Sequence, residues 1–78
     1  MTSLILYTTL GCHLCEQAQL MLVHCQESGL LTWQAIDIAD DEALVERYGI
    51  LIPVIQRTDD AAELGWPFDL ETLVEFAR

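Results

Sequence analysis

The hydrophobic pattern divides the chain into short segments with different periods. Residues 3–8 are rich in β-branched and aromatic side chains and are apolar at four consecutive positions, from Leu4 to Tyr7. This lack of alternation is typical of a central strand that is covered on both faces. After Gly11 a helical pattern follows and is expected to end near Ser28, with Gly29 as the C′ residue. On a wheel of about 100° per residue its apolar stripe comprises Leu14, Ala18, Met21 and Cys25.

The second half of the chain predicts three further strands and a short helix. Residues 32–38 form a second strand, and residues 54–57 and 62–65 form a hairpin across a polar turn. Asp40 is expected to cap a short helix that Gly49 ends.

A last helix is predicted after Asp69, which serves as its N-cap. Phe68 and Leu73 occupy the N′ and N4 positions of a hydrophobic staple. The element order β-α-β-α-β-β-α predicts an α/β fold with one mixed four-stranded sheet and helices on both faces. The first two strands should be parallel because a helical crossover joins them.

Composition limits the partners that such a chain can have. Its 78 residues suit a single domain, residues 1–78, and its formal net charge of -10 disfavours nucleic acids and anionic membranes. Eleven of the thirteen acids follow Ile36, so the first half feels the acidic field mainly through Glu16. Neither a secretory signal nor an apolar stretch of about 18 residues is present, and a cytoplasmic location is therefore expected.

The chemistry of the chain centres on the motif Cys12-His13-Leu14-Cys15. Cys12 falls where the first strand's loop meets the long helix, and free N–H groups and the helix dipole favour an anion there. Cysteines so placed can have a pKa lowered from ~8.5 to roughly 3.5–7.5. Cys15 lies one helical turn away, so Cys12 can attack a disulfide and Cys15 can resolve the mixed disulfide.

The cysteines also allow two other interpretations. A structural zinc site usually has four ligands, but Cys25 lies on the core stripe and His24 on the opposite side of that helix. No metal ligand is therefore assigned. Two incidental cysteines are a second alternative, although the strand-to-helix junction favours redox chemistry. His13 is either a cation that stabilises the thiolate or a solvent-facing residue, and Glu16 opposes ionisation of Cys15.

Four segments of the chain carry a resemblance to a known family. They are Leu6-Tyr7-Thr8-Thr9-Leu10-Gly11-Cys12-His13-Leu14-Cys15, Asp37-Ile38, Tyr48-Gly49-Ile50-Leu51-Ile52-Pro53-Val54 and Leu64-Gly65. Together they resemble glutaredoxins of the thioredoxin superfamily, and most of all the small bacterial glutaredoxin-like proteins whose role is largely undefined. The resemblance runs from about Leu4 to Phe76.

The resemblance implies a thioredoxin-like fold in which Cys12 is the nucleophile and Cys15 the resolving thiol. It also implies that the Ile52-Pro53 bond is cis and faces the cysteines, and that the backbone of Ile52 is free to pair with a substrate. From the residues alone, Pro53 would be an ordinary strand-start proline, since only about 5–6% of such bonds are cis.

A substrate role for Gly65 and Asp69 comes from the same resemblance, because these two residues align with the segment that holds glutathione in the family. Asp69 is first a helix cap. Trp66 departs from the family pattern by placing a large ring where the tripeptide would approach, and Thr9 replaces a basic residue. Pro67 is interpreted as a loop residue.

The predicted function is a thiol-disulfide oxidoreductase, linked to glutathione or thioredoxin, that acts in cell redox homeostasis. A protein or small-molecule disulfide is the expected partner, glutathione is a candidate reductant, no cofactor is expected, and the chain should be a monomer. One alternative is an iron–sulfur or metal carrier. Another is a non-catalytic interaction domain in which Trp66, Phe68 and an acidic surface meet a basic partner.

Overall fold

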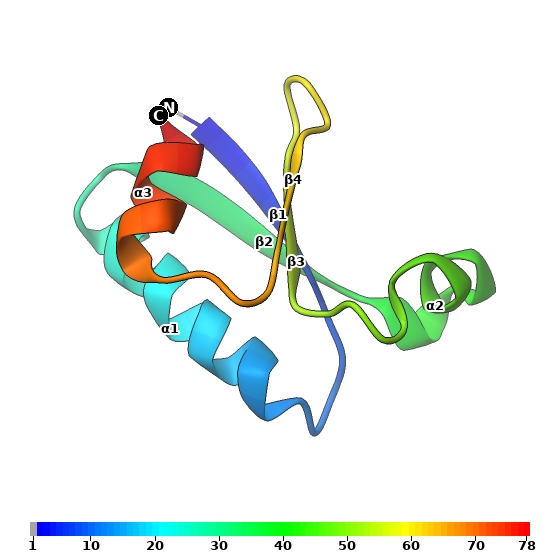
Figure 1. Ribbon diagram of the computed structural model, residues 1–78. Coiled ribbons are helices and arrows are strands. Elements are labelled where there is room, and N and C mark those ends of the chain that lie inside the picture. The colour runs from blue at the N-terminus through cyan, green and yellow to red at the C-terminus, as the bar shows by residue number, and fades with distance from the viewer. Residues whose placement is uncertain (1) are drawn as a thin grey trace.

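The computed structural model describes residues 2–78 and contains one mixed sheet with three α-helices (Figure 1). Strand β1 runs parallel to β2 and antiparallel to β3, and β3 is antiparallel to β4, in the spatial order β2-β1-β3-β4. The predicted topology is therefore confirmed. The elements are β1 (Thr2–Thr8), α1 (His13–Glu27), β2 (Leu31–Asp37), the 3₁₀ turn η1 (Ile38–Asp40), α2 (Glu42–Tyr48), β3 (Val54–Arg57), β4 (Glu63–Gly65) and α3 (Leu70–Ala77).

Helices α1 and α3 lie side by side on one face of the sheet and cover the main core (Figure 1). Leu4 and Leu6 of β1 point to this face and are completely buried. Apolar burial of this kind contributes about 25 cal/mol per Å² and is the main stabilising term. The core comprises Leu4, Leu6, Ala18, Leu22, Cys25, Leu31, Ile55, Phe68, Leu73 and Ala77.

The opposite face holds a second, smaller cluster beneath α2. Tyr48 of α2 stacks on Tyr7 of β1 with ring centroids 4.3 Å apart, and Ile38 and Val54 complete the cluster. The Tyr48 hydroxyl donates to Glu63, and burial, followed by this hydrogen bond, raises the pKa of Tyr48 to about 12. Helices therefore contact both faces of the sheet, as predicted.

The prediction for the α2 cap was wrong by one residue. Asp41, and not Asp40, caps α2: its backbone is extended and its carboxylate accepts the N–H of Ala43 at 2.8 Å. Asp40 lies in η1, which Asp37 caps through the N–H of Ala39. In a run of neighbouring acids, the residue with extended backbone geometry becomes the cap.

The other helix ends agree with the sequence analysis. Ser28 is the C-cap of α1, and Gly29 follows it with a φ of +78°. Asp69 caps α3 by accepting the N–H of Thr72 at 2.8 Å. Within residues 2–78, no helix has the length and hydrophobicity needed to cross a membrane.

Candidate redox site

One end of the sheet collects the predicted site residues. Tyr7 in β1 pairs with Ile36 of β2 on one side and with Val54 of β3 on the other, and Val54 pairs with Gly65 of β4. The loop after β1, the end of β2, the segment before β3 and the end of β4 therefore leave the sheet at the same edge. Helix α1 begins at this edge (Figure 1).

Cys12 is the N-cap residue of α1. Its backbone is extended, with φ -95° and ψ 103°, and its Sγ accepts the N–H of Cys15 at 3.1 Å. Gly11 precedes it with a φ of +78°, a conformation that glycine adopts without steric cost. The sulfur thus lies where free helix N–H groups and the helix dipole favour negative charge.

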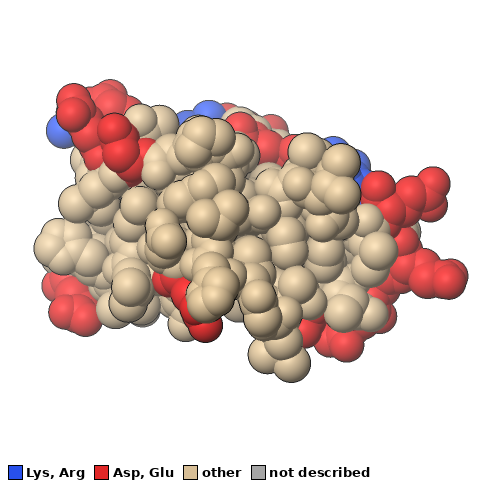
Figure 2. Space-filling view, turned by 60° about the horizontal axis from the view of Figure 1, so that its bottom comes forward, with Lys and Arg blue, Asp and Glu red and all other residues tan. Residues whose placement is uncertain are grey.

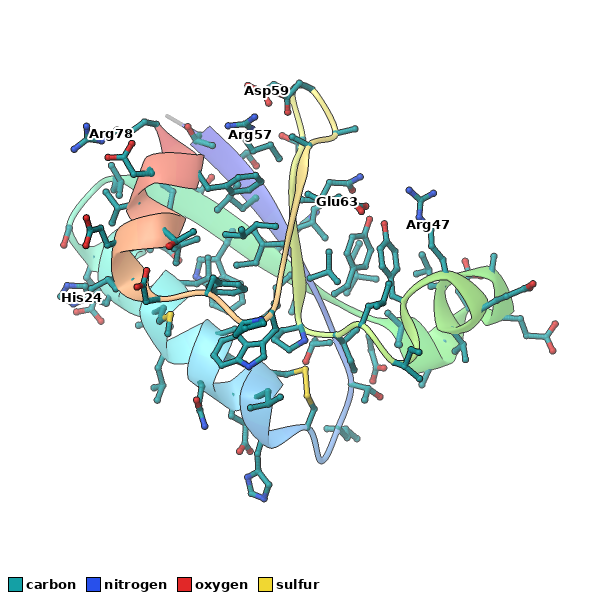
Figure 3. The ribbon with its side chains drawn as sticks, in the orientation of Figure 1. His24, Arg47, Arg57, Asp59, Glu63 and Arg78 are labelled. Atoms are coloured by element: carbon teal, nitrogen blue, oxygen red, sulfur yellow. A yellow bond between two sulfur atoms is a disulfide. The ribbon has the colours of Figure 1, made fainter. Side chains whose placement is uncertain are left out.

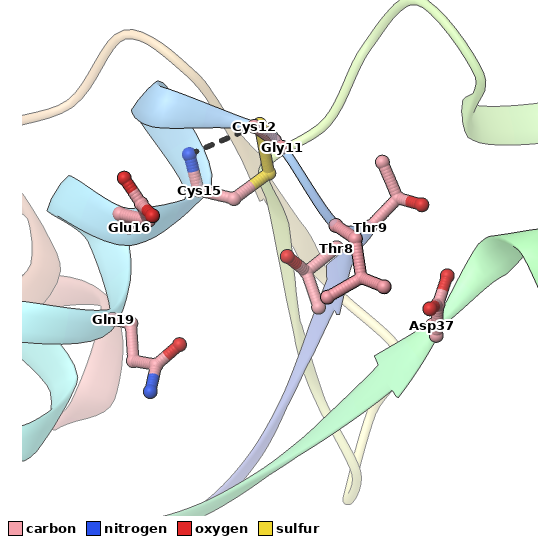
Figure 4. A pocket seen from close by; sticks show the side chains of 9 residues that line it. Thr8, Thr9, Gly11, Cys12, Cys15, Glu16, Gln19 and Asp37 are labelled. Carbon is pink, nitrogen blue, oxygen red and sulfur yellow. Dashed lines mark hydrogen bonds between the residues drawn. A yellow bond between two sulfur atoms is a disulfide. The ribbon is translucent and has the colours of Figure 1, made fainter.

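Cys15 is joined to Cys12 by a disulfide, with the two Cα atoms 5.2 Å apart (Figure 4). The two cysteines differ in depth: Cys15 is only 2% exposed, whereas Cys12 is partly exposed. An incoming sulfur therefore meets Cys12 first. This asymmetry is what a nucleophile and a resolving thiol require.

A pocket of about 230 Å³ opens beside the disulfide (Figure 4). Two carboxylates line it, Glu16 from the first turn of α1 and Asp37 from the end of β2. Asp37 reaches this pocket because the parallel pairing of β1 with β2 places it opposite Thr8. The lining comprises Thr8, Thr9, Leu10, Gly11, Cys12, Cys15, Glu16, Gln19 and Asp37.

The sequence analysis did not assign this pocket. The signal was present, because the carboxyl ends of two parallel strands meet at one edge, and both Thr8 and Asp37 end such strands. The sequence analysis assigns Glu16 an effect on Cys15 and on the field of the first half of the chain, but no place in a pocket.

The residues predicted to bind substrate lie at the same end of the sheet but do not line this pocket. The Ile52-Pro53 bond is cis, as the resemblance implied. The expectation that the Ile52 backbone is free was half wrong, because its N–H donates to the Tyr48 carbonyl at 3.1 Å. Within residues 2–78, no backbone N–H donates to the Ile52 carbonyl.

The segment from Gly65 to Asp69 is held by local contacts. The Trp66 N–H donates to the Pro53 carbonyl at 3.2 Å, and the Trp66 ring meets the Phe68 ring edge to face at 4.9 Å. The Trp66-Pro67 bond is also cis, which the interpretation of Pro67 as a loop residue did not anticipate. The Thr72 hydrogen bonds lower the pKa of Asp69, so its carboxylate is occupied as a helix cap.

His13 lies on the outer surface of α1 with its side chain 93% exposed. Its Nδ1 lies 3.4 Å from a Glu16 carboxylate oxygen, so the negative charge of Glu16 offsets the effect that a protonated imidazole would have on the Cys12 sulfur. A role for His13 in stabilising the thiolate stays a prediction, as does a role for Trp66 in opposing glutathione binding.

The third cysteine differs from the redox pair. Cys25 is 2% exposed within the main core, and burial raises the pKa of its thiol. In the part of the chain from residue 2 to residue 78, no three His, Cys, Asp or Glu side chains are grouped closely enough to hold a metal ion.

Comparison with known families agrees with this geometry. The model of the family described as glutaredoxin-like domain (DUF836) matches residues 3–76. The chain belongs to this family. No curated protein matches it.

Solved structures of similar proteins resemble this glutaredoxin-like domain along most of its length. The X-ray structure of the Northeast Structural Genomics target protein XcR50 from X. campestris is 36% identical, with a TM-score of 0.81, and the match covers 94% of this chain and 92% of that one. The solution structure of XcR50 gives a TM-score of 0.78 at the same identity, over 97% and 91% of the two chains.

Oxidised thioredoxin O2 from Arabidopsis thaliana is more distant. It is 19% identical and has a TM-score of 0.68 over 97% of this chain and 71% of that one. At this identity the match shows the fold alone, which is thioredoxin-like.

Proposed function

We propose that this glutaredoxin-like domain is a dithiol–disulfide oxidoreductase in which Cys12 attacks and Cys15 resolves. One observation carries the proposal: the two cysteines form a disulfide at the start of α1, with Cys12 accessible and Cys15 buried. The thioredoxin-like fold and the Cys12–Cys15 pair both favour redox chemistry, and they occur at the same site.

The reaction transfers two electrons from the dithiol to the substrate. The Cys12 thiolate attacks one substrate sulfur, so that a mixed disulfide forms and the first substrate thiolate leaves and takes up a proton. The Cys15 thiol then loses its proton and attacks the Cys12 sulfur, which releases the second substrate thiol and forms the Cys12–Cys15 disulfide. A thiol reductant, with glutathione as one candidate, must return two electrons to the domain.

Trapping of the mixed disulfide tests the assigned order. A Cys15→Ser variant, reduced and mixed with hydroxyethyl disulfide, should accumulate a one-to-one adduct on Cys12 that intact-protein mass spectrometry detects. The matched Cys12→Ser variant should form little adduct, because Cys15 is buried. An adduct that forms equally fast on both variants would contradict the assignment of Cys12 as nucleophile.

We further propose that the domain acts as a monomer in the cytoplasm and contributes to cell redox homeostasis. Sedimentation equilibrium of the oxidised and reduced protein tests the monomeric state. Cell fractionation with an antibody against the domain tests the cytoplasmic location.

A further inference from the structure

Apolar side chains in the loops that precede Cys12 and Pro53 are strongly exposed. Leu10, two residues before Cys12, is 92% exposed, and Ile50, two residues before Ile52, is 98% exposed. Leu14 and Leu51 are also exposed. Figure 2 turns the lower side of Figure 1 forward, where α1 begins, and shows a broad, mostly uncharged face with acidic groups at its borders and some acidic atoms within it.

The three arginines form ion pairs with acids that do not line the pocket. Figure 3 labels all three arginines, and each lies close to an acid: Arg47 is 3.7 Å from Glu63, Arg57 is 2.9 Å from Asp60 and Arg78 is 3.7 Å from Glu75. None of them lines the pocket, which contains Glu16 and Asp37. The whole chain also carries a formal charge of -10.

Such a field selects among substrates by charge. Glutathione disulfide is anionic, so both the pocket carboxylates and the net charge oppose its approach. A cationic substrate is attracted, and steering of this kind raises association rates by about 10–10³-fold at low ionic strength.

We propose that the substrate is a protein segment in which the reacting cysteine is flanked by an apolar residue and a basic residue. The apolar residue contacts the exposed rim of Leu10, Ile50 and Leu51, and the basic side chain enters the pocket between Glu16 and Asp37. A backbone N–H of the segment donates to the carbonyl of Ile52. This inference rests on the proposed function and follows the same two-electron exchange: the segment's disulfide is reduced and the Cys12–Cys15 disulfide forms.

Matched peptide disulfides test the inference. Three disulfide-linked peptide dimers of one length carry leucine before the cysteine, and they differ only in the residue after it: lysine (the lysine dimer), glutamine or glutamate (the glutamate dimer). A fourth dimer (the serine dimer) has lysine after the cysteine and serine in place of the leucine, so that it is compared with the lysine dimer, which keeps the leucine. Pre-reduced protein is mixed with each dimer, and the released peptide thiol is measured by chromatography after an acid quench. Each rate is divided by the rate at which dithiothreitol reduces the same dimer. This division corrects for intrinsic reactivity, since a neighbouring lysine activates any disulfide.

The lysine dimer should react about tenfold faster than the glutamate dimer at low ionic strength. This ratio should fall towards one at about 0.5 M salt, where screening extends over only ~4 Å. The double variant Glu16→Gln, Asp37→Asn should lower the ratio about threefold, and asparagine can still cap η1. The control variant Glu27→Gln removes one charge from the far end of α1, roughly 16 Å from Glu16, and should change the ratio much less than the double variant does.

The apolar rim has its own variant. Ile50→Ser should reduce the preference for the lysine dimer over the serine dimer, and it removes a side chain that contributes nothing to the core. Equal rates for lysine and glutamate dimers, or a faster reaction with glutathione disulfide than with the lysine dimer, would overturn the inference. Failure to reduce any dimer or hydroxyethyl disulfide would instead overturn the proposed function.

Discussion

The two ends of helix α1 carry the same side chain in opposite chemical situations. At the N-terminal end, Cys12 accepts a backbone N–H, is partly exposed and borders a pocket. Near the C-terminal end, Cys25 is enclosed by the main core, and burial raises the pKa of its thiol. We therefore expect the reactivity of each cysteine to follow from its position on the helix, because ionisation needs solvent or backbone donors around the sulfur.

The largest expected contrast is in activity. Cys12→Ser should lower the rate of disulfide reduction by at least about a thousandfold, because no other accessible thiol can replace the nucleophile. Cys25→Ala, which removes the buried thiol, should change this rate by less than about threefold. A single-turnover assay with hydroxyethyl disulfide measures both rates, and equal losses in the two variants would remove the distinction between the two ends.

Stability should show the reverse contrast. Leu22 is completely buried near the C-terminal end, so Leu22→Ala should reduce the free energy of unfolding by about 2–5 kcal/mol. Leu14 is 42% exposed near the N-terminal end, so Leu14→Ala should change the free energy by only about 0.5 kcal/mol. Urea denaturation of both variants measures the difference, and similar losses would show that the redox end is also part of the core.

The smallest contrast concerns the glycines that flank α1. Gly11 and Gly29 share a φ of +78°, and a Cβ at either position would meet no atom within 4 Å. Substitution by alanine should therefore cost about 1–2 kcal/mol at both positions through the left-handed backbone alone. Only Gly11→Ala should also slow disulfide reduction, since it alters the backbone directly before Cys12.

Thermal unfolding and the hydroxyethyl disulfide assay together test this pair of variants. If Gly29→Ala slowed reduction as much as Gly11→Ala, the redox geometry would depend on the whole helix and not on its first turn.

Several features of the fold could be predicted because they depend on neighbours in sequence. The apolar run from Leu4 to Tyr7 predicted β1, and the position of Cys12 before a helical stripe predicted its role as N-cap. The α2 cap was misplaced from Asp41 to Asp40, because adjacent acids have the same propensity and only the backbone conformation distinguishes them.

The substrate side of the site was harder to predict. The family resemblance supplied the cis bond at Pro53, but the N–H of Ile52 is used by Tyr48 at the end of α2. Hydrogen bonds between a helix end and a loop depend on how α2 packs against the sheet, and a sequence pattern does not contain that packing.

By itself, the sequence determined the order of the strands and α-helices, the α-helix caps apart from Asp41, and the placement of a Cys-x-x-Cys pair at the start of a helix. Tertiary structure decided which side of the disulfide is open and which charges face it. Hydrophobic periodicity and capping act over a few residues, whereas the pocket joins Glu16 to Asp37 through the parallel pairing of β1 with β2. The pairing of the two sulfurs is thus encoded locally, whereas the substrate preference that we propose depends on parts of the chain that meet only in the folded protein.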